Sequence, residues 1–210
     1  MEHPVREIGG VITTLCTGNP SEQTEALETY FLSNATFTHP FCRVPSFFKG
    51  TVPFAPNLDS RRVILFIYQW YRFLSPHVDI TIDSAVFDQR TGQLFVSIRQ
   101  IMTIWFLPFY KAPVSLVTVL QLRQRVTSPD ASRESAALAG PGQERTRYFI
   151  ASQEDLYQFN DCVQFVLPRI GPFFWNIWQL FATFLCIVGA ILSMPLFLFL
   201  NRNMSAKKAL

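Results

Sequence analysis

The chain is predicted to be an α+β protein, because three helical patterns lie within its first 75 residues and four or more antiparallel strand patterns follow them. The spacing of apolar residues changes from about 3.6 to two at Val78. A run of 28 residues without a charge, Phe173 to Leu200, then stands near the C-terminus, and a bilayer core needs only about 20 helical residues. We therefore expect N-terminal helices, an antiparallel sheet and a C-terminal transmembrane or membrane-embedded helix.

Three helices are expected before the strands. The first runs from Pro4 to Leu15, with one apolar stripe and a proline suited to its first turn. Ser21 is the predicted cap of the second helix, whose apolar face is Leu27, Tyr30 and Phe31. The third helix, Arg61 to Leu74, opens at Asp59 or Ser60 and is apolar over most of its circumference, which predicts that other structure surrounds it.

The strands are expected to begin with Asn34 to Pro40, which alternates and ends at proline, before an irregular, proline-rich segment from Phe41 to Leu58. Val78 to Val86 alternate with polar residues as a half-buried strand, with Ser84 and Val86 in the apolar phase. Hairpin-forming residues follow at 88–92. Further strands are predicted at 94–104, 114–125 and 148–151, and Trp105 to Pro113 is expected to be a connector.

Two polar patterns are assigned within this frame. Ser152 and Asp155 fit a capping box at the start of a helix with an apolar stripe through Leu156, Phe159 and Val163, although Asp155 and Tyr157 could instead supply polar groups near a pocket or a membrane. Arg99 interrupts an apolar strand and is expected to pair with Asp79 or Asp83 across the hairpin. The predicted domains are residues 1–167, with a disordered insert at 126–147, a membrane segment at 173–200 and a basic tail at 201–210.

Composition excludes several classes of function. A net charge of +3, scattered along the chain, does not favour nucleic acid. The four cysteines stand at no metal-like spacing, so we expect free thiols in a reducing compartment and neither a metal nor a cofactor. The first residues lack the apolar core of a signal peptide, which predicts a cytosolic globular part.

The two ends of the apolar run suggest different topologies. A C-terminal anchor without a signal peptide predicts a tail anchor with a lumenal tail, whereas Lys207-Lys208-Ala209-Leu210 matches a di-lysine retrieval pattern that is read from the cytosol. A hairpin bent at Pro195 would place both ends in the cytosol. Either topology suggests the endoplasmic reticulum, and the sequon Asn34-Ala35-Thr36 offers a test of orientation.

The order of elements resembles the nuclear transport factor 2-like superfamily. The residues that carry the resemblance are the helices 21–31 and 61–74, the hairpin 78–104 and the strands 114–125 and 148–151. The stretch Gln153 to Gln158 is similar to a fungal, sigma-factor-F-like subgroup. The resemblance implies helices lying across a strongly curved antiparallel sheet, a cone with an internal pocket. Catalytic members place Asp, His or Tyr in that cone, and others only bind ligands, so the fold alone does not choose a function.

The candidate pocket residues follow from strand alternation and the aromatic content. His39 shares a strand face with Phe37, so either both enter the cone, where His39 acts as a base or hydrogen-bonds a ligand, or His39 is a structural histidine before Pro40. Aromatic side chains are expected either to line the pocket or to fill the core. The complete pocket set is Phe31, Phe37, His39, Phe66, Trp70 and Tyr71.

The candidate membrane contacts lie at the connector and at the start of the apolar run. An aromatic run stands beside Lys111 and consists of Trp105, Phe106, Phe109 and Tyr110. This run predicts a loop tip that dips into the bilayer. The alternatives are a dimer interface and a tip folded under the insert. Trp175 and Trp178 lie where interfacial anchors belong.

The function expected from these observations is that of a non-catalytic, membrane-anchored accessory protein that binds or handles an apolar ligand, lipid- or sterol-like, at the bilayer surface. His39 has no acidic partner at a recognisable spacing, which argues against an enzyme. The alternatives are an isomerase, cyclase or dehydratase with His39 as base, and a scaffold for membrane enzymes. Expected partners are membrane lipid, an apolar small molecule, and a second copy of the chain or a membrane enzyme.

Overall fold

We analysed a computed structural model, which describes residues 1–104, 106–127, 145–167 and 170–208. Side chains are described for these residues except at 107–110, 126–127, 145, 160, 164–166 and 195–208. The chain divides into two compact units, Met1–Cys162 and Val163–Leu210. Each unit is described by itself below.

The first unit begins with two helices, α1 (Pro4–Thr17) and α2 (Pro20–Tyr30), and a third helix, α3 (Ser60–Leu74), follows later. The caps explain where they begin. Asp59 accepts a hydrogen bond from the backbone N–H of Arg62, so the predicted opening of α3 is confirmed. The cap of α2 is Asn19 rather than Ser21, because Asn19 and Glu22 form a reciprocal capping box.

The strands form one six-stranded sheet in the order β2-β1-β6-β5-β4-β3. Their bounds are β1 (Phe31–His39), β2 (Cys42–Val44), β3 (Val78–Asp88), β4 (Gln93–Ile104), β5 (Leu107–Thr127) and β6 (Arg145–Tyr157). The short β2 lies within the segment that was predicted to be irregular. All pairings are antiparallel except that of β1 with β6, which is parallel.

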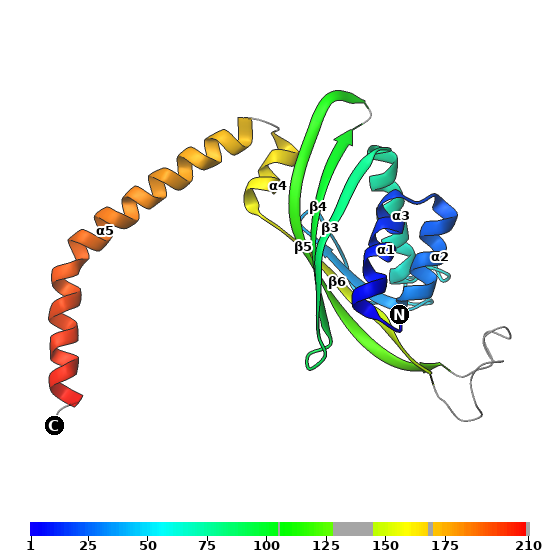
Figure 1. The fold of residues 1–210 in the computed structure, drawn as a ribbon, viewed down its shortest axis with the longest axis horizontal. Helices are drawn as coiled ribbons and strands as arrows, with labels where there is room; N and C mark the ends of the chain where they lie inside the picture. Colours follow the sequence, from blue (N-terminus) through cyan, green and yellow to red (C-terminus); the bar gives the residue numbers. More distant parts are fainter. Residues whose placement is uncertain (105, 128–144, 168–169, 209–210) are drawn as a thin grey trace. The chain divides into compact units, whose positions relative to one another are not determined.

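Irregular pairing shifts the alternation of β3 near its middle. A β-bulge lies between Ile82 and Ser84, so the two strand phases exchange beyond it. Ala85 and Phe87 therefore pack against the core, and Val86, which was predicted to point inward, is 62% exposed. Further register shifts occur between β4 and β5 and between β5 and β6. Figure 1 shows the long, curved strands with α1, α2 and α3 along one side of the sheet.

Two predictions about the last strands are wrong. Residues 107–113 are not a connector, because β5 begins at Leu107 and pairs with β4 at Leu107 and from Lys111 to Gln121. Ser152 and Asp155 do not cap a helix, because β6 continues to Tyr157 and the next helix, α4, spans Phe159–Val166. The predicted insert is also shorter than 126–147, since β5 reaches Thr127 and β6 starts at Arg145. The rest of it lies outside the described residues.

The core of the first unit lies between the helices and the inner face of the sheet. Ile8 and Leu15 of α1, Leu27 of α2 and Ile64 of α3 pack against fully buried strand residues. The largest of these are Phe31, Phe37, Leu94, Leu120 and Ile150. α3 is not surrounded as predicted, because Phe66, Trp70 and Phe73 are more than half exposed.

The second unit contains one long helix, α5 (Ile170–Lys208). Its stretch Ile170–Met194 is long and apolar enough to cross a membrane, by length and composition. The helix continues past Pro195, so the described residues form one segment rather than two antiparallel ones. Figure 1 shows that α5 bends along its length.

Candidate functional site

A polar and aromatic cluster occupies the inner face of the sheet in the first unit. The strands place it there, because alternate residues of one strand share a face. On β1, Phe37 and His39 are two residues apart and share the inner face. On the neighbouring β6, the same spacing of two relates Gln153, Asp155 and Tyr157. Thr118 of β5 stands directly opposite Asp155. We call these residues, with Tyr68 and Tyr71 of α3 and Gln100 of β4, the inner cluster.

His39 lies among aromatic rings. Its ring stacks on Phe37 at a centroid distance of 6.2 Å and meets the edge of Tyr157 at 4.9 Å. Nδ1 of His39 accepts a hydrogen bond from the backbone N–H of Phe41 at 3.3 Å and lies 3.4 Å from the Tyr71 hydroxyl. Burial lowers the pKa of His39 to about 4, so the imidazole is neutral at pH 7.

Asp155 is held by its own neighbours. Thr118 Oγ1 donates a hydrogen bond of 2.7 Å to the carboxylate, and Gln153 Nε2 donates another at 3.0 Å. The Tyr68 hydroxyl in turn donates to Gln153 Oε1 at 3.0 Å. Burial raises the pKa of Asp155 to about 6, against the two hydrogen bonds, which favour the charged form. Asp155 is thus an interior carboxyl rather than the helix cap predicted for it.

The tyrosines are hydrogen-bonding groups and not bases. Burial is the main cause that raises the pKa of Tyr157 and of Tyr68 well above the ordinary value, and the charge of Asp155 adds to it. Burial also raises the pKa of Tyr71 above its ordinary value. Gln100 Nε2 donates to the Tyr157 hydroxyl at 3.3 Å. At neutral pH the inner cluster therefore carries no cation. Its one acidic side chain, Asp155, has a pKa of about 6 and titrates just below neutral pH.

The inner face is packed at one end and accessible at the other. Along β4, Leu94, Val96 and Ile98 are fully buried, whereas Gln100 and Met102 keep part of their surface exposed. His39, Tyr71, Asp155 and Tyr157 are also partly accessible. These inward-pointing polar groups therefore remain partly accessible to solvent at one end of the inner face.

The predicted pocket residues separate into three groups. Phe37, His39 and Tyr71 belong to the inner cluster, and Phe31 is a buried core residue. Phe66 and Trp70 are 51% and 57% exposed, on the opposite side of α3 from the buried Ile64, so they lie apart from the cluster. The sequence did contain a signal for Gln153, Asp155 and Tyr157. Their spacing of two fits a strand, but their apolar neighbours also fit a helical period.

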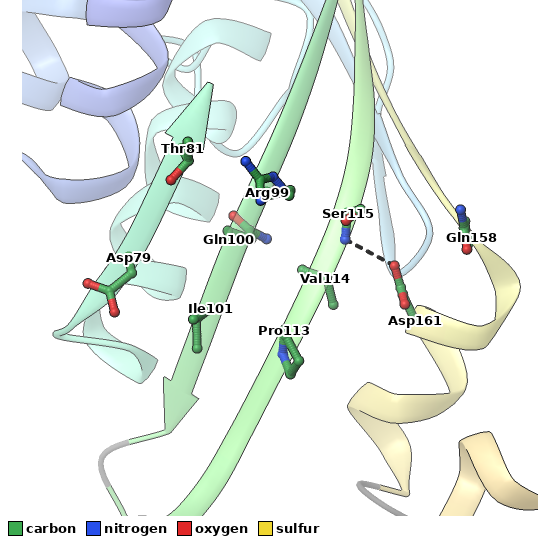
Figure 2. A pocket seen from close by; sticks show the side chains of 10 residues that line it. All are labelled: Asp79, Thr81, Arg99, Gln100, Ile101, Pro113, Val114, Ser115, Gln158 and Asp161. Atoms are coloured by element: carbon green, nitrogen blue, oxygen red, sulfur yellow. Dashed lines mark hydrogen bonds between the residues drawn. The ribbon is translucent and has the colours of Figure 1, made fainter. Parts of the chain in front are cut away.

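A hollow lies on the outer side of the sheet, and Figure 2 shows the side chains that line it. Its volume is about 370 Å³. The Ser115 backbone N–H donates to Asp161 Oδ2 at 3.1 Å across it. Arg99 at its rim is held by Asp83 at 2.6 Å, which confirms one of the two predicted pairings. Its lining is Asp79, Thr81, Arg99, Gln100, Ile101, Pro113, Val114, Ser115, Gln158 and Asp161. The charges of this lining are mixed, and Arg99 is paired with Asp83 outside it, which is the character of a solvated surface.

The predicted membrane contacts are only partly visible. Phe106 is 54% exposed in the turn between β4 and β5. Trp105 lies outside the described residues, and so do the side chains of Phe109 and Tyr110. Trp175 and Trp178 lie on α5, and Trp178 is largely exposed. Among the described residues, no group of three or more His, Cys, Asp or Glu side chains is placed to hold a metal ion.

Comparison with known proteins identifies the fold and the family. No curated protein matches the chain. A hypothetical protein from Catenulispora acidiphila with a ketosteroid isomerase-like fold, solved in complex with trimethylamine, is 16% identical with a TM-score of 0.44. The match covers 72% of this chain and 84% of that one. An epoxide hydrolase of M. tuberculosis is 10% identical with a TM-score of 0.44, over 78% and 95% of the two chains.

A protein-family model extends over nearly the whole sequence. It describes the SigF NTF2-like domain and matches residues 1–130 and 138–196. The match includes the strands of the inner cluster and most of α5. The chain therefore belongs to the family of SigF NTF2-like domains.

Proposed function

We propose that this chain is a membrane-attached binding protein, whose cone takes up a neutral, mainly apolar molecule with a hydrogen-bonding head. The observation that carries the proposal is the chemistry around His39. A neutral imidazole and the Tyr71 and Tyr157 hydroxyls stand among aromatic rings at the accessible end of the inner face. Such a lining suits an uncharged head on a flat or chain-like apolar body, as in sterols and acyl lipids.

The state of Asp155 argues for binding rather than for catalysis. A general base must reach the proton that it abstracts. The Asp155 carboxylate instead accepts hydrogen bonds from Thr118 and Gln153 of the same chain. The pKa of His39, lowered to about 4 by burial, also makes that imidazole a weak base. Both groups therefore favour a site that orients a ligand without transferring its protons.

The apolar helix α5 supports the membrane part of the proposal. The span Ile170–Met194 is not buried by the rest of the structure and has a mean hydropathy of 2.0. A globular part that faces the cytosol at the endoplasmic reticulum belongs to the same proposal, on the strength of the Lys207-Lys208 tail. An apolar ligand would then be exchanged with the adjacent bilayer.

Mass spectrometry of bound lipids tests this function. The full chain is purified in detergent beside the double variant His39→Ala, Tyr71→Phe and beside Thr81→Ala, a control on the outer face of β3. We expect one lipid class to be enriched in the wild type and the control and depleted at least tenfold in the double variant, because two hydrogen-bonding groups contribute about 1 kcal/mol or more each. Equal lipid content in all three proteins contradicts the proposal.

A second function is favoured by the pKa of Asp155, since perturbed carboxyls beside tyrosines are common in catalytic sites. In an isomerase, cyclase or dehydratase, Asp155 or His39 would move a proton of a lipophilic substrate. The same purification distinguishes the two functions. An enzyme would carry a mixture of substrate and product, and Asp155→Asn would carry only one of the two. A binding protein would carry the same molecule in the wild type and in Asp155→Asn.

A further inference from the structure

We propose that the exposed face of α3, together with Phe106 between β4 and β5, lies on an anionic bilayer surface. This inference rests on the membrane attachment in the proposed function and adds a second, peripheral contact to it. The face consists of Arg62, Phe66, Trp70 and Phe73, and we call it the α3 face. Its members are spaced by three or four residues, so they share one side of the helix.

The α3 face is an aromatic stripe on an otherwise well-packed helix. Phe66, Trp70 and Phe73 are between 51% and 59% exposed, and the rings of Trp70 and Phe73 stack at 5.8 Å. The other side of α3 supplies the fully buried Ile64 and contacts the core. A helix with one face in the core and large aromatic side chains on the other is typical of an interfacial membrane contact.

The sequence segment that contains the α3 face carries a net positive charge, which suits anionic lipid headgroups. Residues 41–76 hold five of the 18 basic residues of the chain but only one of its 15 acidic residues. That acid, Asp59, caps α3. Within the described residues, Arg62 has no ion pair or side-chain hydrogen bond, and Arg61 and Arg72 donate only to backbone carbonyls. The positive charge of the segment is thus not neutralised by carboxylates of the described residues, and each such cation favours an anionic surface.

The C-terminal end of α3 is hydrogen-bonded to the end of β4, two residues before Phe106. The Thr103 backbone N–H donates to Ser75 Oγ at 3.2 Å, and the Thr103 hydroxyl donates to the His77 carbonyl at 2.8 Å. These bonds hold the end of β4 beside the end of α3. Phe106, 54% exposed, is therefore near the C-terminal end of the α3 face.

Chain length makes such a contact feasible. Seven residues, 163–169, stand between the end of the first unit and the start of the candidate span. Even fully extended, they reach about 25 Å. A membrane-embedded span therefore holds the first unit at a high effective concentration at the bilayer, so a weak peripheral contact is sufficient. The contact would also turn the accessible end of the cone, where Gln100 and Met102 lie, toward the lipid.

Tryptophan quenching by brominated lipids tests the proposal on the full chain in vesicles. In one variant Trp70 is the only tryptophan, with Trp105, Trp175 and Trp178 replaced by Phe. A second variant keeps only Trp178 and reports on the span. A third, Val86→Trp in the chain with all four tryptophans replaced, reports on the exposed outer side of β3 and is the control. Vesicles are phosphatidylcholine alone or mixed with phosphatidylserine.

We expect quenching of Trp70 and Trp178 but not of the tryptophan at position 86. Quenching of Trp70 should increase with phosphatidylserine. Arg62→Glu should lower the ratio of protein with the α3 face docked on the bilayer to protein with it undocked at least about fivefold, because one cation near an anionic surface changes that equilibrium by about this factor. If Trp178 is quenched and Trp70 is not, the proposal is wrong although the membrane attachment stands. If neither is quenched, the attachment itself fails. Protection of Trp70 by chain dimerisation that Phe66→Ser reverses would assign the face to a second copy and overturn the proposal.

Discussion

Replacing Asp155 with Asn tests the electrostatic account of the inner cluster. Burial raises the pKa of Asp155 from 3.8 to about 6, so the folded protein binds this proton more tightly than the unfolded chain does. The contribution of Asp155 to the free energy of unfolding is therefore greatest below about pH 4 and falls as the pH rises to about 6. A shift of about two units corresponds to about 3 kcal/mol. Because Asp155 is partly accessible by surface area, we expect about 1–3 kcal/mol.

Asn keeps the shape of the side chain and cannot ionise. Its amide disturbs the bonds from Thr118 and Gln153 by an amount that does not depend on pH, so the informative quantity is the change with pH. The variant should gain 1–3 kcal/mol relative to the wild type between pH 4 and pH 8. His39 acts in the opposite direction, since its lowered pKa makes stability fall as the pH drops from about 6.5 to about 4. Comparison of the two proteins at each pH cancels that contribution.

The measurement is urea unfolding of the full chain in uncharged detergent, followed by tryptophan fluorescence from pH 4 to pH 8. Thr118→Val is a companion variant, which removes one donor to Asp155 and should raise the pKa of the carboxyl further. Its loss of stability should grow with pH. A difference between Asp155→Asn and wild type that stays constant within about 0.5 kcal/mol across this range would show that Asp155 is not desolvated as described.

Three further predictions concern single positions. Gly92→Ala should destabilise the protein by about 1–2 kcal/mol in urea unfolding, because Gly92 has φ of 70° and a Cβ would meet the Leu122 carbonyl oxygen at 3.1 Å. The matched variant Gly50→Ala, also at positive φ but in open space, should cost less, and equal costs would contradict the steric argument. Asn19→Ala should cost about 1 kcal/mol through the lost cap of α2, whereas Asn19→Asp should cost little; equal losses would refute the cap. Expressed in microsomes, the chain should remain unglycosylated at Asn34, so a shift in gel mobility on deglycosylation would place the globular part in the lumen.

The helices and the first strands could be predicted because their signals are local. Asp59 caps α3 from the adjacent position, and Pro4 opens α1 at its first residue. The alternation of inward and outward residues from Val78 could be predicted from β3 alone as far as the bulge between Ile82 and Ser84. Beyond that point the phase depends on pairing with β4, so Val86 could not be placed from its own segment.

The end of β6 shows why local patterns can mislead. Ser152 and Asp155 match a capping box, and the apolar residues that follow match a helix. Pairing with the long strand β5 outweighs both signals, since the backbone groups of β5 opposite these residues would otherwise lack partners in the sheet. That pairing puts Asp155 opposite Thr118 and makes it an interior carboxyl.

The sequence by itself determined the α+β class, the family resemblance and the apolar C-terminal helix, because composition and periodicity act along the chain. Only the tertiary structure decided which polar groups meet. His39 and Tyr71, and Tyr68 and Gln153, are 32 and 85 positions apart, and strand pairing and the packing of α3 bring them together. The same packing directs Phe66 and Trp70 outward, although their residue type is that of the core. Burial depends on which face of a helix meets the sheet, and no single segment carries that information.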